Sequence, residues 1–239
     1  MEDTLHHILT FIRRNILQNI LIGEIMKCFI INFNRLTLSK NLADWVASCG
    51  IDVFFIDNNS TYEPLLEYYE SCPYEVIKLS GNHGHMVFWN TGLYEKYCKG
   101  ERYILTDPDL DLSGIPKDFL HILEEGLDRY PEYPKCGFSL ETLDLPDTEI
   151  GRSSKTYEQQ YWNVPLDNMY YAAKIDTTFS LNKVSYHTYN AIRTNRPYTA
   201  KHVPWYYTSV DEMTDDEKNY FLTCSGTHWA GVVRDQLMK

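Results

Sequence analysis

Three aspartates close together in the middle of the chain have the residue type and spacing to bind a metal ion. The apolar residues 103–105 predict a short buried strand, and Asp107, Asp109 and Asp111 follow at alternating positions as it ends. Carboxylates in such a place need a positive partner if they are to be buried. Because carboxylate oxygens suit hard cations, we expect them to hold Mg²⁺ or Mn²⁺.

Two other interpretations of the same aspartates are less consistent with the sequence. A calcium-binding EF-hand loop would need a glycine where Leu112 stands and a glutamate where Asp118 stands, and it would follow a helix rather than a strand. The aspartates could also do no more than cap a helix expected over residues 116–130 and face water.

The predicted elements around this stretch alternate between strand and helix. The expected strands cover residues 27–33, 53–56, 75–79 and 103–105, and the expected helices cover 39–48, 62–71, 85–98 and 116–130. Ser39 is the expected cap of the first of these helices. The alternation predicts an α/β fold with a mainly parallel central sheet flanked by helices on both faces. Ligands bind at the carboxyl ends of strands in such sheets, and here all four ends are polar: Asn34-Arg35, Asp57-Asn58-Asn59, Asn82-His83 and Asp107-Pro-Asp109.

The second half of the chain is less regular. Residues 136–140 predict a strand that leads to Glu141 and Asp144, whereas residues 146–160 predict a mobile loop or the start of a helix. Two strand-like runs over residues 170–181 surround Asp176, which we expect inside an apolar strand pattern. A last helix is expected near residue 214, with a start that resembles a capping box.

Composition limits the classes of function. The chain has 239 residues, a hydrophobic fraction of 44% and a formal net charge of −11, so it can build a sizeable core but lacks the charge of a general nucleic-acid binder. Its six cysteines are scattered without a CxxC pair, which argues against a zinc site and favours a reducing, cytoplasmic compartment. We expect one domain over residues 27–239.

An additional amphipathic helix is expected at the N-terminus, over residues 1–26. Apolar side chains recur at helical spacing from residue 4 to residue 26, with Thr4 as cap and Gly23 as end. The helix either packs on its own domain or makes a peripheral membrane contact, with Arg13 and Arg14 near anionic headgroups.

Four segments together resemble the glycosyltransferases of the GT-A (Rossmann-like) fold, and family-2-like enzymes most closely. Asp107-Pro-Asp109 resembles their DxD motif. The other three segments follow the family's order over residues 27–130: Asn32-Phe-Asn-Arg35, Phe54-Phe-Ile-Asp57-Asn58-Asn59-Ser60, and Gly81-Asn-His-Gly84 through Trp89-Asn90-Thr-Gly92.

The resemblance implies a metal-dependent transfer of a sugar from a nucleotide-sugar donor, a UDP-sugar foremost, to a glycan or lipid-linked acceptor. It also implies that the domain has a nucleotide-binding half (27–130) and an acceptor-binding half (131–239). Metal ligands would be Asp109 directly and His202 from the C-terminal half, with His228 in reserve. Asp107 would either reach the metal through water or hold the ribose. The nucleotide-sugar would contact residues at the strand ends: Phe33, Asn34, Arg35, Asp57, Asn58, Asn90 and Asp107.

An inverting enzyme of this kind also needs a carboxylate base near the acceptor hydroxyl. Asp176 is the first candidate, and Glu141 and Asp144 are the others. A retaining enzyme would need no such base, and Asp176 would then be a hydrogen-bonded structural residue.

Two rival functions remain. A sugar nucleotidyltransferase would share the sheet and the acidic metal ligands, but it usually carries a glycine-rich basic loop after its first strand, where this chain has Asn34-Arg35-Leu36-Thr37. A non-catalytic domain of the same fold would only bind a glycan or a partner.

Overall fold

The computed structural model describes residues 25–224, 231 and 233–235. The first half of the described chain contains the following elements: β1 (Lys27–Asn32), α2 (Thr37–Ala47), β2 (Asp52–Asp57), α3 (Glu63–Ser71), β3 (Glu75–Lys78), α4 (Val87–Asn90), α5 (Leu93–Tyr97) and β4 (Tyr103–Thr106). The strand predictions are confirmed here. The helix expected over 85–98 is two short helices, because Gly92 adopts a φ of +73° between them.

The second half contains shorter strands and more connecting segments: β5 (Leu110–Asp111), α6 (Phe119–Arg129), β6 (Lys135–Gly137), β7 (Ser139–Leu140), α7 (Glu149–Glu158), η1 (Gln159–Trp162), β8 (Tyr170–Ala172), β9 (Ser180–Asn182), β10 (Ile192–Thr194), β11 (Thr199–His202), η2 (Val203–Trp205), η3 (Val210–Glu212) and α8 (Asp215–Thr223). Residues 146–160 therefore contain a helix, and Asp176 lies in the loop between β8 and β9. The prediction that Asp176 sits inside a strand is wrong.

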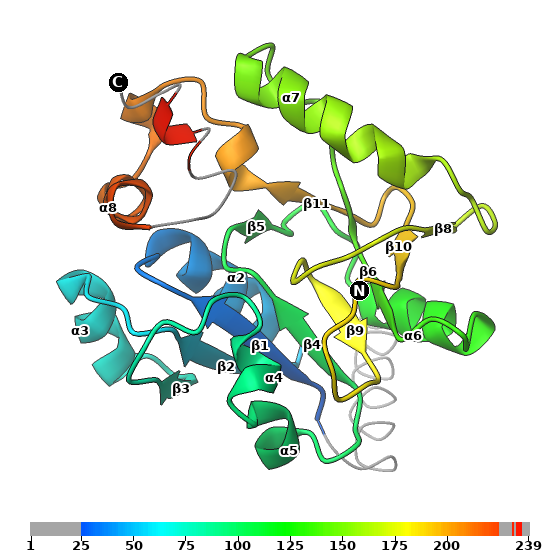
Figure 1. Cartoon of the computed structure of the whole chain (residues 1–239), viewed down its shortest axis with the longest axis horizontal. Coiled ribbons are helices and arrows are strands. Elements are labelled where there is room, and N and C mark those ends of the chain that lie inside the picture. Colours follow the sequence, from blue (N-terminus) through cyan, green and yellow to red (C-terminus); the bar gives the residue numbers. More distant parts are fainter. Residues whose placement is uncertain (1–24, 225–230, 232, 236–239) are drawn as a thin grey trace, which may run out of the picture.

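Within the described residues, eight strands form a mixed sheet in the order β3-β2-β1-β4-β9-β6-β10-β8, and three form a small sheet in the order β5-β11-β7 (Figure 1). The strands β3, β2, β1 and β4 are parallel, and β9 joins β4 in the antiparallel sense. The predicted α/β class is confirmed, with a sheet that is parallel in its first half and mixed in its second.

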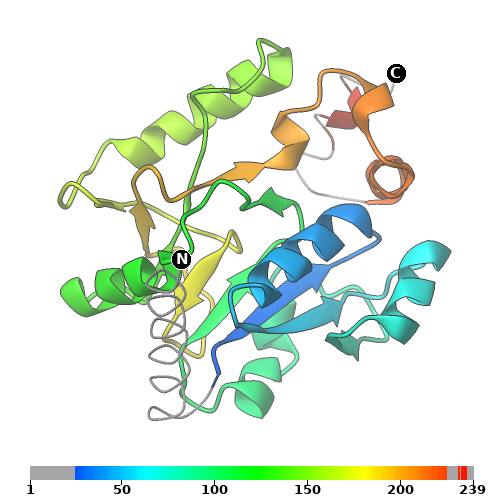
Figure 2. The ribbon, with the colours of Figure 1, turned by 180° about the vertical axis from the view of Figure 1, so that it is seen from behind.

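Strand alternation divides the core of the large sheet into two layers. Cys28 and Ile30 of β1 pack with α2, α3 and α6, whereas Phe29 and Ile31 pack with α4 and α5 on the other face. Figure 2 shows α2 in front of the sheet in the view from behind, while Figure 1 shows α4 and α5 in front. The apolar run of β1 thus serves both faces, as expected for a buried parallel strand.

The segment expected as one strand over 136–140 contributes to both sheets. β6 belongs to the large sheet and β7 to the small one, with Phe138 between them. Gly137 is required at this bend, because a Cβ atom there would lie 2.4 Å from the carbonyl oxygen of Phe179. The chain therefore passes from the large sheet to the small sheet at a point where only glycine fits.

The predicted Ser39 cap is wrong, and the capping box predicted for the last helix does not form, although α8 has Thr214 as its N-cap residue as predicted. α2 begins at Thr37, and its first backbone N–H groups, those of Leu36 and Thr37, donate to the Asp216 carboxylate at 2.8 Å. Ser39 lies inside the helix, where its hydroxyl donates to the Arg35 carbonyl. Glu217 does not complete a capping box at the start of α8, because it is buried against Arg35. Long-range contacts therefore replace the local caps.

The helix expected over residues 1–26 and the reserve ligand His228 lie outside the described residues. Within the described residues, no helix is long and apolar enough to cross a bilayer.

Candidate functional site

The side chains of Asp109 and His202 meet because the small sheet brings them together. Asp109 follows β4 and precedes β5, and β5 pairs with β11 so that Leu110 lies opposite His202. The backbone N–H of Val203 donates to the Asp109 carbonyl at 3.0 Å. This pairing places His202 Nε2 at 3.2 Å from Asp109 Oδ2. Two of the three predicted metal ligands are thus in contact, although 93 positions separate them along the sequence.

Arg35 is the third partner of this pair and comes from the segment after β1. Its guanidinium donates through Nη1 to Asp109 Oδ2, and its Nε lies 2.8 Å from Glu217 Oε1 of α8. The guanidinium also stacks over the Tyr220 ring, at 3.7 Å from the centroid. Arg35, Asp109 and Glu217 are all buried. Removing any one of them would leave a buried charge without part of its compensation.

The surroundings of Asp107 and Asp109 shift their pKa values in opposite directions. Burial alone would raise the pKa of Asp109, but His202 and Arg35 hold it well below its usual range. Burial and the nearby carboxylates of Asp176 and Asp109 raise the pKa of Asp107 to about 7. At neutral pH, Asp109 is therefore ionised, whereas Asp107 can exchange a proton.

Polar atoms without a partner remain at the centre of this arrangement. Within the described chain, Asp109 Oδ1 and His202 Nδ1 are buried and accept or donate no hydrogen bond. Buried polar atoms are rarely left unpaired unless a ligand or water completes them. A carboxylate oxygen beside an imidazole is a donor set that fits a divalent cation, so these residues suit the metal expected from the sequence.

The number of protein ligands is small. No group of three or more His, Cys, Asp or Glu side chains within the described residues is arranged to hold a metal ion. Asp107 does not form such a group with Asp109 and His202. Its Oδ1 accepts a hydrogen bond from Thr177 Oγ1 at 2.7 Å. The chain itself would thus supply two ligands, Asp109 and His202, and the remaining positions would belong to water and substrate oxygens, as is common for Mg²⁺.

The Asp176 loop lies beside Asp107. The backbone N–H of Asp107 donates to the Thr177 carbonyl at 3.0 Å, and the buried ammonium of Lys135 donates to the Asp176 carbonyl at 2.6 Å. Partial desolvation opposes ionisation of Asp176, but hydrogen bonds from Thr178 and the charge of Arg193 outweigh it and lower the pKa. Burial lowers the pKa of Lys135 to about 8. Asp176 is therefore an ionised carboxylate next to the predicted metal motif.

A buried ion pair supports this loop from the side of α7. Arg193 of β10 donates to Glu158 Oε2 at 2.8 Å and to the Lys174 carbonyl at 2.8 Å. Both side chains of the pair are almost fully buried, and the guanidinium lies over the Tyr161 ring. Arg193 therefore ties the Asp176 loop to α7.

The predicted nucleotide-binding residues gather at the carboxyl ends of β1 and β2. Asn32 and Asp57 are aligned in the parallel register, and the backbone N–H of Asn58 donates to the Asn32 carbonyl. Asp57 accepts a hydrogen bond from the Ser60 backbone at 3.2 Å, and burial raises its pKa. Asn58 holds the loop after β3 through Gly84.

The other three residues of that set differ in their surroundings. Asn34 Oδ1 accepts from the backbone N–H groups of Thr61 and Tyr62, so this side chain fixes the start of α3. Phe33 is half-buried at the end of β1, and Asn90 is exposed on α4.

Asp109, His202, Arg35 and Glu217 form what we call the Asp109 cluster. Glu141 and Asp144 do not lie in it. Alternation along β11 directs Lys201 and His202 to opposite faces, and Lys201 is the residue that pairs with Asp144, at 2.5 Å. Glu141 receives two hydrogen bonds from Arg196, at 2.9 and 2.8 Å. Burial alone would raise the pKa of Glu141, but these bonds and those from backbone N–H groups lower it to about 2. Neither carboxylate is placed or poised to act with Asp109.

The alternative that the aspartates cap the next helix is wrong, since the N-cap residue of α6 is Asp118. Asp111 is exposed and accepts from the Ser113 backbone.

Four buried residues around the Asp109 cluster and the Asp176 loop were not among the sequence candidates. Lys135, Glu158, Thr177 and Glu217 are buried and contact the predicted residues or their loop. A weak signal exists for Lys135, which opens the apolar strand before Cys136, and for Thr177, which follows Asp176. Glu158 and Glu217 give no such signal, because their neighbours in the sequence are polar, as in any exposed helix.

Comparisons with known proteins do not supply a family for the chain. No protein-family model matches it, and no curated protein matches it either.

Proposed function

We propose that this chain is a metal-dependent glycosyltransferase of the GT-A type, which transfers a sugar from a nucleotide-sugar donor, UDP-sugar foremost, to a glycan or lipid-linked acceptor. The observation that carries the proposal is the contact between Asp109 and His202 with unpaired Asp109 Oδ1 and His202 Nδ1. The resemblance of four sequence segments to that family also supports it.

The donor would lie across the carboxyl ends of β1, β2 and β4. Asp57 would accept a hydrogen bond from a base N–H, and a uracil offers one. Arg35 adds a fixed positive charge beside Asp109, where the diphosphate would lie. When bound by Asp109 and His202, Mn²⁺ or Mg²⁺ would stabilise the negative charge on the leaving diphosphate. The imidazole favours Mn²⁺ of the two, because Mg²⁺ prefers oxygen ligands.

Asp176 is the base that the arrangement favours for an inverting reaction. It is ionised at neutral pH, and its loop is fixed to Asp107 by Thr177 and to the sheet by Lys135. It would take the proton of the acceptor hydroxyl as that oxygen attacks the sugar. Glu141 and Asp144 are saturated by ion pairs on the far face of β11.

A non-catalytic domain of the same fold is the second candidate, and one observation favours it. Arg35 already pairs with Asp109 Oδ2, so a cation would have to share this carboxylate with a guanidinium.

Titration calorimetry with UDP separates these functions. We expect UDP to bind in the presence of Mn²⁺ and to bind much more weakly with EDTA. Absence of UDP binding in both conditions would contradict the transferase proposal and favour the non-catalytic one. A screen of nucleotide-sugars for slow hydrolysis would then identify the donor.

A further inference from the structure

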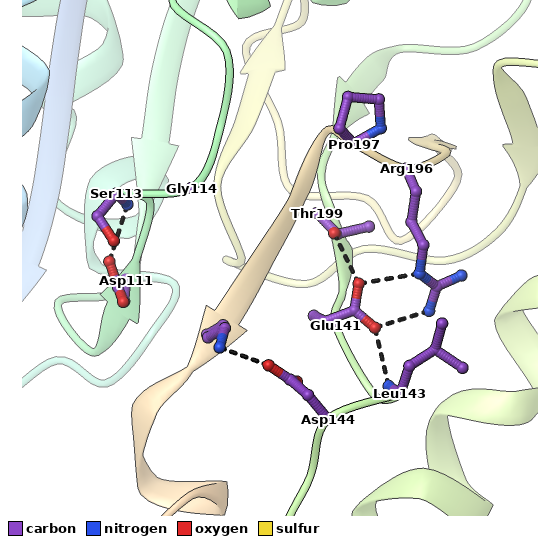
Figure 3. A pocket seen from close by; sticks show the side chains of 10 residues that line it. Asp111, Ser113, Gly114, Glu141, Leu143, Asp144, Arg196, Pro197 and Thr199 are labelled. Atoms are coloured by element: carbon purple, nitrogen blue, oxygen red, sulfur yellow. Dashed lines mark hydrogen bonds and ion pairs between the residues drawn. The ribbon is translucent and has the colours of Figure 1, made fainter.

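The structure contains a pocket on the face of β11 that is turned away from Asp109. It has a volume of about 580 Å³, which is within the range of small-molecule sites. Figure 3 shows Glu141 between Thr199 and Arg196, with Asp111 and Ser113 across the strand. The wall is made by residues of β5 and the segment after it, of β11 and the turn before it, and of the segment after β7.

The polar groups of this pocket are fixed before any ligand arrives. Glu141 is held by Arg196, by Thr199 and by the backbone N–H groups of Thr142 and Leu143. In the same way Asp144 is held by Lys201 and by Tyr206, at 2.5 and 2.7 Å. Preorganised groups lose little conformational entropy on binding, so such a wall suits a weakly bound polar ligand.

Hydrogen-bonding capacity remains on both donors and acceptors. Arg196 uses Nε and Nη2 on Glu141, and within the described chain its Nη1 has no hydrogen-bond partner. Lys201 has further N–H groups beyond the one given to Asp144, and Asp111 has used only Oδ1. A ligand whose groups both donate and accept hydrogen bonds would suit this mixture of donors and acceptors, and hydroxyl groups do both.

The charge of the pocket excludes a simple anion. Asp111, Glu141 and Asp144 outnumber Arg196 and Lys201 among the lining residues. A phosphate or sulfate would meet this excess of carboxylates, whereas a neutral polyol would not be repelled. Leu143, whose side chain is exposed, offers a small apolar surface for the C–H face of a sugar ring.

The pocket and the candidate metal ligands share two strands. Lys201 lies opposite Asp111 and His202 lies opposite Leu110, so β5 and β11 present the pocket on one face and the Asp109 cluster on the other. We propose that this pocket, bounded by Asp111, Glu141, Arg196 and Lys201, binds a neutral oligosaccharide, as a subsite for the part of a glycan acceptor that does not react. The assignment as an acceptor subsite rests on the proposed transferase function, but the binding of a glycan does not.

Saturation-transfer NMR on the full chain tests the proposal without nucleotide or metal. The probes are neutral gluco-, galacto- and chito-oligosaccharides of two to six sugars, with inorganic phosphate and sulfated oligosaccharides as the anionic comparison. The affinity of each probe that binds is then measured by calorimetry. We expect a neutral probe to bind, and Lys201→Met and Asp111→Asn to weaken its binding at least tenfold.

Lys155→Met is the matched control, because Lys155 is an exposed lysine on α7. It should leave glycan binding unchanged, and thermal melting of each variant should show that all are folded. The proposal is overturned if no neutral probe binds, if the anionic probes bind instead, or if both pocket variants bind as the wild type does. UDP–Mn²⁺ binding is measured separately, so failure of the transferase proposal with intact glycan binding would indicate a glycan-binding domain.

Discussion

The strand β11 separates two carboxylate clusters that differ in how completely their oxygens are hydrogen-bonded. On one face, Asp109 pairs with Arg35 and His202 but keeps Oδ1 buried and unpaired among the described residues. On the other face, Glu141 accepts from Arg196, Thr199 and two backbone N–H groups. The unpaired atoms make the Asp109 face the candidate for binding a metal ion, whereas the carboxylates of the Glu141 face are already hydrogen-bonded and could only form a fixed wall for a ligand.

Replacing one carboxylate by its amide on each face should test this difference most clearly. We expect Asp109→Asn to weaken Mn²⁺-dependent UDP binding by about 100-fold, or about 2.7 kcal/mol, because it removes the ligand charge. Glu141→Gln should change that affinity less than about threefold. Calorimetry measures both. Asn keeps an acceptor for Arg35, which also retains Glu217, so Asp109→Asn should stay folded by circular dichroism. Wild-type UDP–Mn²⁺ affinity in Asp109→Asn would place the metal elsewhere.

Stability should distinguish the two ion pairs on the Glu141 face, because they differ in burial. Glu141→Gln removes the charge from a bidentate ion pair and should lower the free energy of unfolding by about 2 kcal/mol. Asp144→Asn is the matched comparison. The Asp144–Lys201 pair is more exposed, so its loss should cost less than about 1 kcal/mol. Urea denaturation of the two variants measures the difference. Equal effects would mean that burial does not set the strength of these pairs.

The contact between α8 and α2 provides a third comparison. Asp216→Ala leaves the N–H groups of Leu36 and Thr37 without their acceptor, and we expect a loss of about 1–2 kcal/mol. Asp215→Ala, at the exposed neighbouring position on the same helix, should have little effect. Thermal melting of both variants measures this. If the two variants melted alike, Asp216 would not act as the cap of α2.

The smallest expected effect is a pH dependence that comes from Glu217. Burial raises the pKa of Glu217 from 4.5 to about 7, although Arg35 opposes the shift. The folded state therefore binds a proton that the unfolded state releases between these values. This contribution is fully present below about pH 4.5 and is lost as pH rises through about 7.

Measured between pH 5.5 and 8, the wild type should lose stability on the order of 1 kcal/mol more than Glu217→Gln does. Urea denaturation at both pH values gives the two slopes. Parallel slopes would show that Glu217 does not titrate in this range.

The first half of the fold could be predicted from the sequence because its signals are local. The apolar runs of β1, β2 and β4 are long enough to indicate buried strands, and polar residues mark their carboxyl ends. The two helices between residues 85 and 98 were harder to predict, since the division depends on the backbone conformation of Gly92.

The candidate site could be predicted only in part. Asp109 and His202 were chosen through the resemblance to a family, and the pairing of β5 with β11 then accounts for their contact. Glu158 and Glu217 could not be found, because nothing in their own sequence segments requires an ionised side chain to be buried. Each is buried because of an arginine far away in the sequence: Arg193 for Glu158, and Arg35 for Glu217.

The tie between Arg35 and α8 also has a consequence for the order of folding. Arg35 follows the first strand of the large sheet, but Glu217 lies 182 residues further along. During synthesis, β1 and α2 would leave the ribosome long before α8 does. Until then, Arg35 would lack one partner and α2 would lack its cap. Contacts of such high sequence separation form late, so the large sheet would assemble first and the Asp109 cluster would mature with the last helix.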